Sequence, residues 1–288
     1  MELLKRFIDA QVHFGHKTSK WNPHMQPYIW GAKNNIHIIN ISETEKSLDQ
    51  AKKFLKEIAE QGRQIMFVGT KKAAQKAIEE VAKKANMPFV SQRWVGGTVT
   101  NFGHVKKSFA KLLHMQDVIT KSSEFAYTKK ELSTIQKNVE RLQKNIGGII
   151  GLKYPIGALV LVDIKKDQTA LREARAAGVP VVAFVDTNDD PLMVGQNGVV
   201  IPTNNDSPKA IALILEELGA AVQEGVEVAK SKPAQSLEAQ EVETTSEPFF
   251  MEEDDSSEEA RARGKKGALK QTARTPRAAK KPIRTTKP

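Results

Sequence analysis

The apolar positions of this chain fall into two alternating patterns. Apolar runs of strand length occur at 36–40, 65–68, 88–90, 158–162, 181–185 and 199–201, and stretches with helical spacing lie at 2–11, 42–62, 72–85, 168–177 and 208–223. Strands without polar alternation, interleaved with amphipathic helices, are typical of a parallel sheet that helices cover on both faces. We therefore predict a doubly wound, mainly parallel α/β sheet of five or six strands, with 36–40 as its first strand. Ser42 and Glu45 show the capping-box pattern at the start of the second helix.

An insertion at 104–150 separates the two halves of this pattern. Apolar residues at steps of three and four run over 105–119 and again over 132–146, with a polar break at 121–128. Two heptad-like stretches joined by a short connection predict an antiparallel coiled-coil helical hairpin. At ~1.5 Å per residue each arm is about 25–30 Å long, so we expect the hairpin to project from the domain.

Charge divides the chain into a basic body at 1–230 and a tail of mixed sign at 231–288. The formal net charge is +10, of which the tail contributes +2, because ten acidic residues and one lysine precede eleven basic residues. A basic body is the electrostatic footprint of a nucleic-acid-binding protein, although it also suits other anionic partners. The tail has few apolar residues, so we predict that it is disordered, acidic up to about residue 260 and basic beyond.

The sequence also limits the compartment and the chemistry. It contains no cysteine, which excludes disulfides and cysteine-ligated metal or redox sites. The opening MELLKRFIDAQ lacks the apolar core and small-residue cleavage site of a signal peptide. No run approaches the ~20 apolar residues that a membrane span requires. We therefore expect a soluble, cytoplasmic protein with no membrane partner.

The segment QRWVGGTVTN at 92–101 lies where the strand and helix pattern stops and the hairpin begins. It combines a cation in Arg93, an aromatic ring in Trp94, and two glycines, Gly96 and Gly97. This set suits a polyanion with unstacked bases, because arginine reaches phosphate, indole can stack on a base, and glycine lets backbone N–H groups approach. The alternative is that Trp94 fills the core and the glycines form a turn.

A second aromatic and basic segment, at 12–34, shows no periodicity and holds two of the three tryptophans. Two prolines fix its path, so we predict an irregular segment that lies on RNA, stacks on bases and pairs with phosphates. The alternative is a loop sealed onto the domain by its aromatic residues. The two interpretations are compatible if Trp30 is buried while Lys17 and Lys20 stay exposed.

The sequence carries little sign of catalysis. Neither G-x-G-x-x-G after a strand nor G-x-x-x-x-G-K-[ST] is present, and no nucleophile elbow appears. Gly69, Thr70 and Lys71 follow a strand, so backbone N–H groups and a lysine could hold the phosphate of a nucleotide or of a nucleic acid. We interpret the chain as a non-enzyme and keep a nucleotide-binding α/β enzyme as the alternative. A third hypothesis is a protein adaptor that works through the hairpin and the tail.

Acidic residues gather after the later strands, where a doubly wound enzyme would hold a metal ion. They are Asp163, Asp186, Asp189, Asp190 and Asp206. Together with His16 from elsewhere, these carboxylates could bind a divalent cation. The alternative is that they cap helices and turns.

Several long segments carry a family resemblance. They are VHFGHKTSKWNPHMQPYIWGAKNNIHIIN at 12–40, MFVGTKKAAQKA at 66–77, QRWVGGTVTNF at 92–102, NIGGI at 145–149, and VPVVAFVDTNDDP with VVIPTNND at 179–206. In order and spacing they resemble the bacterial form of the universal small-subunit ribosomal protein two, the S-two family, through about residue 225.

The resemblance implies a structural constituent of the small ribosomal subunit that supports translation from near the junction of head and body. It implies binding to small-subunit ribosomal RNA, contact with neighbouring ribosomal proteins, help in anchoring the S-one protein, and no small-molecule substrate. By similarity, RNA contact is expected at Lys17, Lys20, Trp21, Asn22, Arg93, Trp94, Gly96, Gly97, Thr98 and Asn101.

Some members of this family look like metal binders. His16, Asp186 and Asp206 match their motifs, so the resemblance implies at most one divalent ion, zinc or magnesium, and no other required cofactor. Asn205 stands where the family usually has a second Asp, and the loss of one carboxylate weakens a site for a hard cation.

Overall fold

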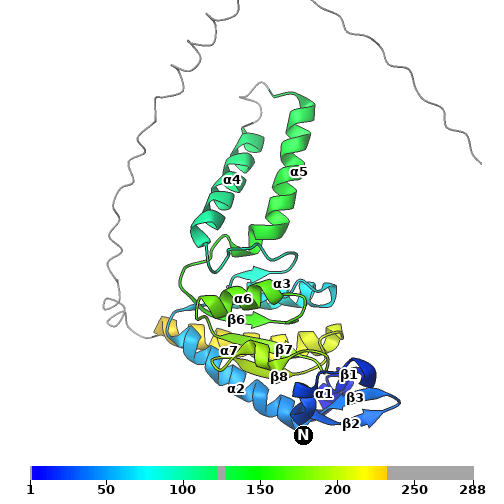
Figure 1. Cartoon of the computed structure of the whole chain (residues 1–288). Helices are drawn as coiled ribbons and strands as arrows, with labels where there is room; N and C mark the ends of the chain where they lie inside the picture. Colours follow the sequence, from blue (N-terminus) through cyan, green and yellow to red (C-terminus); the bar gives the residue numbers. More distant parts are fainter. Residues whose placement is uncertain (1, 122–126, 232–288) are drawn as a thin grey trace, which may run out of the picture. The chain divides into compact units, whose positions relative to one another are not determined.

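The centre of the fold is a sheet of five parallel strands (Figure 1), seen in a computed structural model that describes residues 2–121 and 127–231. The strands are β4 (Gln64–Val68), β5 (Phe89–Val90), β6 (Ile156–Leu161), β7 (Val181–Val185) and β8 (Val199–Pro202). Their order is β5-β4-β6-β7-β8, so the winding reverses between β4 and β6. The prediction of a parallel α/β sheet is confirmed.

Helices cover both faces of this sheet. They are α2 (Ile41–Glu60), α3 (Lys72–Ala85), α6 (Gln168–Ala176) and α7 (Pro208–Ser231), and the 3-10 turn η4 (Pro191–Val194) joins β7 to β8. Ile65 and Phe67 of β4 pack in the core formed with α2, α3 and α7. Met66 and Val68 pack in a second core with α6 and the base of the insertion. Because β4 is buried on both faces, its sequence is apolar throughout.

The run at 36–40 does not join this sheet, so that prediction is wrong. The bounds here are α1 (Glu2–Asp9), β1 (Phe14–Lys17), η1 (Thr18–Lys20), η2 (Pro23–Tyr28), β2 (Ile29–Lys33) and β3 (Ile36–Ile39). Strand β3 is the centre of a separate antiparallel sheet with the order β1-β3-β2. The segment at 12–34 is therefore largely regular. Of β3 only Ile39 is buried, and an antiparallel strand needs only one covered face.

Helix α2 begins at Ile41, and its cap, Asn40, lies two residues before the predicted cap, Ser42. The side-chain oxygen of Asn40 accepts a hydrogen bond from the backbone N of Ser42 at 3.1 Å. Ser42 is already inside the helix, so the predicted capping box is wrong; asparagine caps a helix as well as serine does. Within the first turn, Thr44 is buried and donates to the carbonyl of Pro202 at 2.6 Å, which fixes α2 against β8.

The insertion forms two long helices that lie side by side and extend away from the sheet (Figure 1). They are α4 (Phe102–Thr120) and α5 (Lys129–Ile146), followed by the 3-10 turn η3 (Gly147–Ile149). Thr128 and Glu131 form a capping box at the start of α5. At the base, Phe109, Leu112 and Ile146 are buried in the second core, so the hairpin is anchored to the domain. The coiled-coil character of the pair stays a prediction, and the tail from residue 232 lies outside the described residues.

Candidate functional site

All five parallel strands end at one edge of the sheet, called here the carboxyl edge. The loops 69–71, 91–101, 162–167, 186–190 and 203–206 follow the five strands. The small antiparallel sheet also joins the main domain at this edge. Thr187 Oγ1 accepts from the backbone N of His16 at 2.8 Å, and Thr187 O accepts from the backbone N of Asn22 at 2.8 Å. A Cβ at Gly15 would lie 2.5 Å from Thr187 Cγ2, so the close approach requires glycine.

The loop at 92–101 is held by one carboxylate, that of Glu173 on α6. Glu173 Oε1 accepts from Trp94 Nε1 at 3.0 Å and from the backbone N of Gly97 at 2.9 Å. Its Oε2 accepts from the backbone N of Val99 at 3.2 Å. Gly97 has φ +87°, a conformation that glycine adopts without strain. Sequence reasoning missed Glu173 entirely.

The ten residues predicted to contact RNA divide by exposure. Within the loop, Arg93, Gly96 and Asn101 are exposed and Gly97 is partly so. Trp94 is only 9% exposed and Thr98 is fully buried, so these two side chains support the loop from within. Trp94 therefore packs in the second core, as the alternative interpretation expected. No base can stack on this indole in the conformation seen here.

The other predicted residues lie at the end of β1 and in the turns that follow it. Lys17 and Lys20 are exposed, whereas Trp21 and Asn22 are partly buried. The Trp21 ring lies 5.2 Å from the ring of His37, centroid to centroid, and Asn22 Oδ1 accepts from the backbone N of His24 at 3.0 Å. Trp30 is 76% exposed. The segment was expected to be sealed onto the domain and to lie on RNA at once only if Trp30 were buried, so the structure does not meet that condition.

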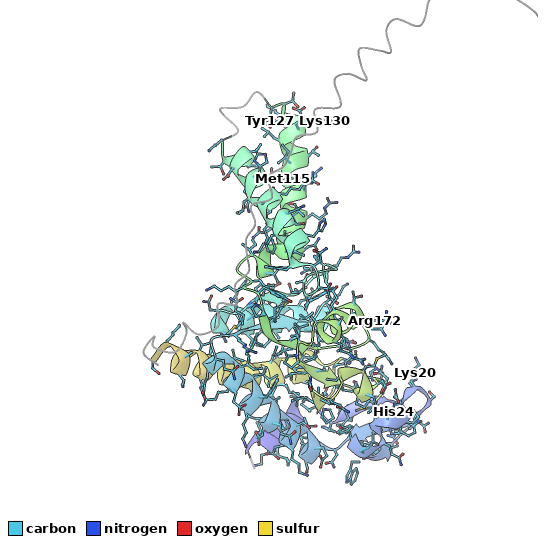
Figure 2. The ribbon with its side chains drawn as sticks, turned by 60° about the vertical axis from the view of Figure 1, so that its left-hand side comes forward. Lys20, His24, Met115, Tyr127, Lys130 and Arg172 are labelled. Carbon is cyan, nitrogen blue, oxygen red and sulfur yellow. The ribbon has the colours of Figure 1, made fainter. Side chains whose placement is uncertain are left out.

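Exposed basic side chains come from several segments at the carboxyl edge. We define the carboxyl-edge basic surface as Lys17, Lys20, Arg93, Lys165 and Lys166, all of which are exposed. Arg93 and Lys166 line one cavity of about 400 Å³, and Lys165 donates to the carbonyl of Asn188. His24 Nδ1 lies 3.1 Å from Asp190 Oδ1. This contact links the loop at 186–190 to the turn η2, which precedes β2 of the antiparallel sheet. In Figure 2, Lys20, His24 and Arg172 project from the same side of the molecule.

Behind this surface the acidic residues are engaged within the chain. His16 Nδ1 lies 3.1 Å from Asp186 Oδ1, and His16 Nε2 lies 3.2 Å from Asp206 Oδ2. Lys71 Nζ contacts Asp206, lies 3.3 Å from Asp163 and donates to Asn205 Oδ1 at 2.8 Å. The ligand atoms of His16, Asp186 and Asp206 all lie within 4.8 Å of one another, so the structure brings the three predicted metal ligands together.

Burial and charge set the protonation of this cluster. The Asp186 carboxylate, with further negative charge from Asp206 and Asp189, raises the pKa of His16. Its Nδ1 is buried, and Asp186 Oδ1 is the carboxylate oxygen 3.1 Å from it. Burial raises the pKa of Asp189 to about 7. Asn205 Nδ2 donates to Asp189 Oδ2 at 3.0 Å, so this residue supplies a neutral donor where a second aspartate would add charge.

The reversal between β4 and β6 is where doubly wound enzymes bind their ligands. Here Asp167 bridges the two strand ends, because it accepts from the backbone N of Thr70 at 3.1 Å and from Thr70 Oγ1 at 2.8 Å. Burial raises the pKa of Asp167. Lys71 is held by its acidic neighbours and Thr70 by Asp167, so these two donors of the nucleotide hypothesis are already used within the chain.

Comparison with known families decides the class of protein. A family model described as Ribosomal protein S2 matches residues 7–225. The chain belongs to the ribosomal protein S2 family. Ribosomal protein S2 is a structural protein of the small ribosomal subunit, and the family is not an enzyme family. Among the described residues, no helix combines the length and apolar character needed to cross a membrane.

Glu173 gives the first test of this site. We expect Glu173→Gln to lower the free energy of unfolding by roughly 1–3 kcal/mol. Both carboxylate oxygens of Glu173 accept from N–H groups, so the NH₂ group of glutamine would place a donor against a donor. Chemical denaturation measures this change. Glu140→Gln, at an exposed position on α5, is the control and should change stability by less than about 0.5 kcal/mol. Equal effects of the two substitutions would contradict the role assigned to Glu173.

Proposed function

We propose that this ribosomal protein binds small-subunit ribosomal RNA through the carboxyl-edge basic surface, near the junction of head and body. In this proposal it acts in the cytoplasm as a scaffold and catalyses no reaction. The observation that carries the proposal is the loop at 92–101, which Glu173 and the buried Trp94 hold in one conformation while Arg93 stays exposed. A fixed loop with an exposed guanidinium can meet a folded RNA backbone with little loss of entropy.

Electrostatics supports the same proposal. The buried Asp163 and Asp186 and the exposed Asp206 are paired with Lys71 and His16, so they offset little of the positive charge of the surface. Arg93 comes from the loop after β5, Lys166 from the loop after β6, Lys17 from β1 and Lys20 from the turn η1. Charges on separate elements can contact separate phosphates. Charge therefore attracts the RNA, and the rigid spacing of the elements selects its shape.

Substitution of Arg93 tests RNA binding. We expect Arg93→Ala to weaken binding to a small-subunit ribosomal RNA transcript and to reduce the slope of log K against log salt by roughly 0.7–0.9, the value for one lost phosphate contact. Filter binding over a salt series measures both quantities. Lys144→Ala, on the exposed face of α5, is the matched control and should leave the slope unchanged.

A gradient experiment tests the same proposal in a lysate. The chain should sediment with the small subunit and move to the top of a sucrose gradient after ribonuclease treatment. Sedimentation at the top in both samples at low salt would overturn the proposal.

We propose that the antiparallel sheet, rather than the RNA-binding surface, helps anchor the S-one protein. Trp30 is the most exposed of the large apolar side chains that the structure describes. With Ile8, His13 and Ile38 it lines a cavity of about 320 Å³ between α1 and the antiparallel sheet. An exposed tryptophan beside an apolar cavity is typical of a protein-binding surface.

Trp30→Ala tests this second contact. The variant should retain its affinity for the ribosomal RNA transcript. Its affinity for purified S-one protein should fall roughly 30-fold or more, as for an interface hot spot of ~2 kcal/mol, and a pull-down measures this loss. Leu192→Ala, which removes another exposed apolar side chain, is the control. Loss of RNA binding in Trp30→Ala with S-one binding unchanged would reverse the assignment of the two surfaces.

We propose further that His16, Asp186 and Asp206 hold one divalent cation. Imidazole and carboxylate oxygen together suit zinc. The buried Nδ1 of His16, which lacks an aligned hydrogen-bond partner, supports the fit. The bound ion would join the antiparallel sheet, through His16, to the loops after β7 and β8, and no reaction is assigned to it.

The pH dependence of His16 tests the cation site. Because its pKa is raised above 6.5, the ion pairs of His16 stabilise the fold below pH 6.5, and this contribution is lost as pH rises through the raised pKa. Zinc requires the neutral ring, so its effect has the opposite sign. Zinc chloride should raise Tm more at pH 8 than at pH 6, equivalent to about 2.7 kcal/mol when free zinc is ~100-fold above its Kd. His16→Gln should remove both effects and His114→Gln neither; a zinc effect that survives in His16→Gln would disprove the site.

A further inference from the structure

Two aromatic rings lie together at the base of the hairpin, outside the two segments assigned above to RNA contact. Phe102 is the first residue of α4, and Tyr154 lies two residues before β6. Their ring centroids are 6.1 Å apart and their planes differ by 18°, so the rings are stacked with an offset. Tyr154 is 54% exposed. We call this pair the hairpin-base platform.

The platform is fixed from below. Phe102 also makes an edge-on contact with Phe109, at 6.2 Å between centroids, and Phe109 is buried in the second core. The chain before Tyr154 is tied to β4, because Gln64 Oε1 accepts from the backbone N of Lys153 at 2.6 Å and Gln64 Nε2 donates to the carbonyl of Gly151 at 3.3 Å. An exposed tyrosine on such a support loses little conformational entropy when a ligand covers it.

Positive charge surrounds the platform. Lys106 Nζ lies 5.3 Å from the centroid of the Phe102 ring, and Lys153 is exposed next to Tyr154. Arg63 lines the cavity of about 340 Å³ beside Tyr154, and Glu57 is the acidic residue on the same wall. An exposed ring among cations matches the two parts of a nucleotide, a flat base and a phosphate.

We propose that Tyr154 and Phe102 form a stacking site for one unpaired base of RNA, with Lys106 and Lys153 beside its phosphate. This inference rests on the proposed RNA-binding function and extends it. Asn101, the last residue of the loop at 92–101, directly precedes Phe102. The loop that carries Arg93 therefore leads directly into the platform. Because every base has a flat face, the site selects unpaired nucleotides without selecting a sequence.

The experiment uses the full chain, a small-subunit ribosomal RNA transcript and a 12-nucleotide oligoadenylate. Tyr154→Ala and Tyr154→Leu should weaken binding of both RNAs roughly 5- to 150-fold, the range that corresponds to ~1–3 kcal/mol per stacked base, while Tyr154→Phe keeps the affinity. The salt slope should stay unchanged in Tyr154→Ala, because stacking releases no counterions. In Lys106→Ala the slope should fall by roughly 0.7.

The controls separate this proposal from the general RNA-binding function. If Arg93→Ala weakens binding and neither Tyr154→Ala nor Tyr154→Leu does, the stacking site is wrong and the RNA-binding surface stands. If the wild-type chain binds neither RNA, both proposals fail. Equal loss in Tyr154→Phe and Tyr154→Ala would show that the hydroxyl group matters rather than the ring. Loss of a protein partner from Tyr154→Ala, with RNA affinity unchanged, would make the platform a protein contact instead. Thermal denaturation of each variant confirms that it is folded.

Discussion

All five strands of the main sheet run in one direction, and this constraint determines where every candidate contact lies. Parallel strands cannot be joined by tight turns, so each connection must cross the sheet and return. The polar residues at the strand ends therefore gather at one edge, although they are far apart in the sequence. Arg93, Lys166 and Asp186 follow three different strands and meet there. The antiparallel sheet then attaches through Thr187, which brings Lys17 and Lys20 to the same edge.

Acidic and basic residues are both abundant at this edge, but most of them lie at different depths. Asp163, Asp186 and Asp189 are buried, whereas Lys165, Lys166 and Arg93 reach solvent. Asp206 is exposed and Lys71 is partly buried. Buried carboxylates are costly unless they are paired or hydrogen-bonded. Here Lys71, His16 and backbone N–H groups meet most of that demand, and Asp189 meets the rest through a raised pKa. The result is a positive outer face on a domain whose strand ends are rich in aspartate.

The parallel sheet and the hairpin could be predicted because each depends on local spacing of apolar residues. Which of the two sheets contains 36–39 could not be predicted, since a short apolar run fits a buried parallel strand and a half-exposed antiparallel strand equally well. The prediction of the helix cap failed for a similar reason: Asn40 and Ser42 are both good caps, and only the tertiary structure selects Asn40.

The candidate site shows the same limit more strongly. Its residue types were visible in the sequence, but their roles were not. Trp94 and Arg93 are adjacent, yet one is buried and the other exposed. Glu173 lies more than seventy residues from the loop that it holds, inside a helix where a glutamate is normally just a solvated side chain. No local pattern reports such a contact.

The contact with Glu173 also explains why a loop with two glycines can serve as a recognition element. Glycine makes a free chain more flexible, so ordering such a loop during binding would cost about 1–2 kcal/mol of backbone entropy per residue. Glu173 accepts from two backbone N–H groups and from the indole of Trp94, so the loop is already ordered in the isolated domain. The cost is then met during folding rather than during binding. The same argument applies to Tyr154, because Gln64 holds the backbone of the preceding residue and the tyrosine ring stacks on Phe102.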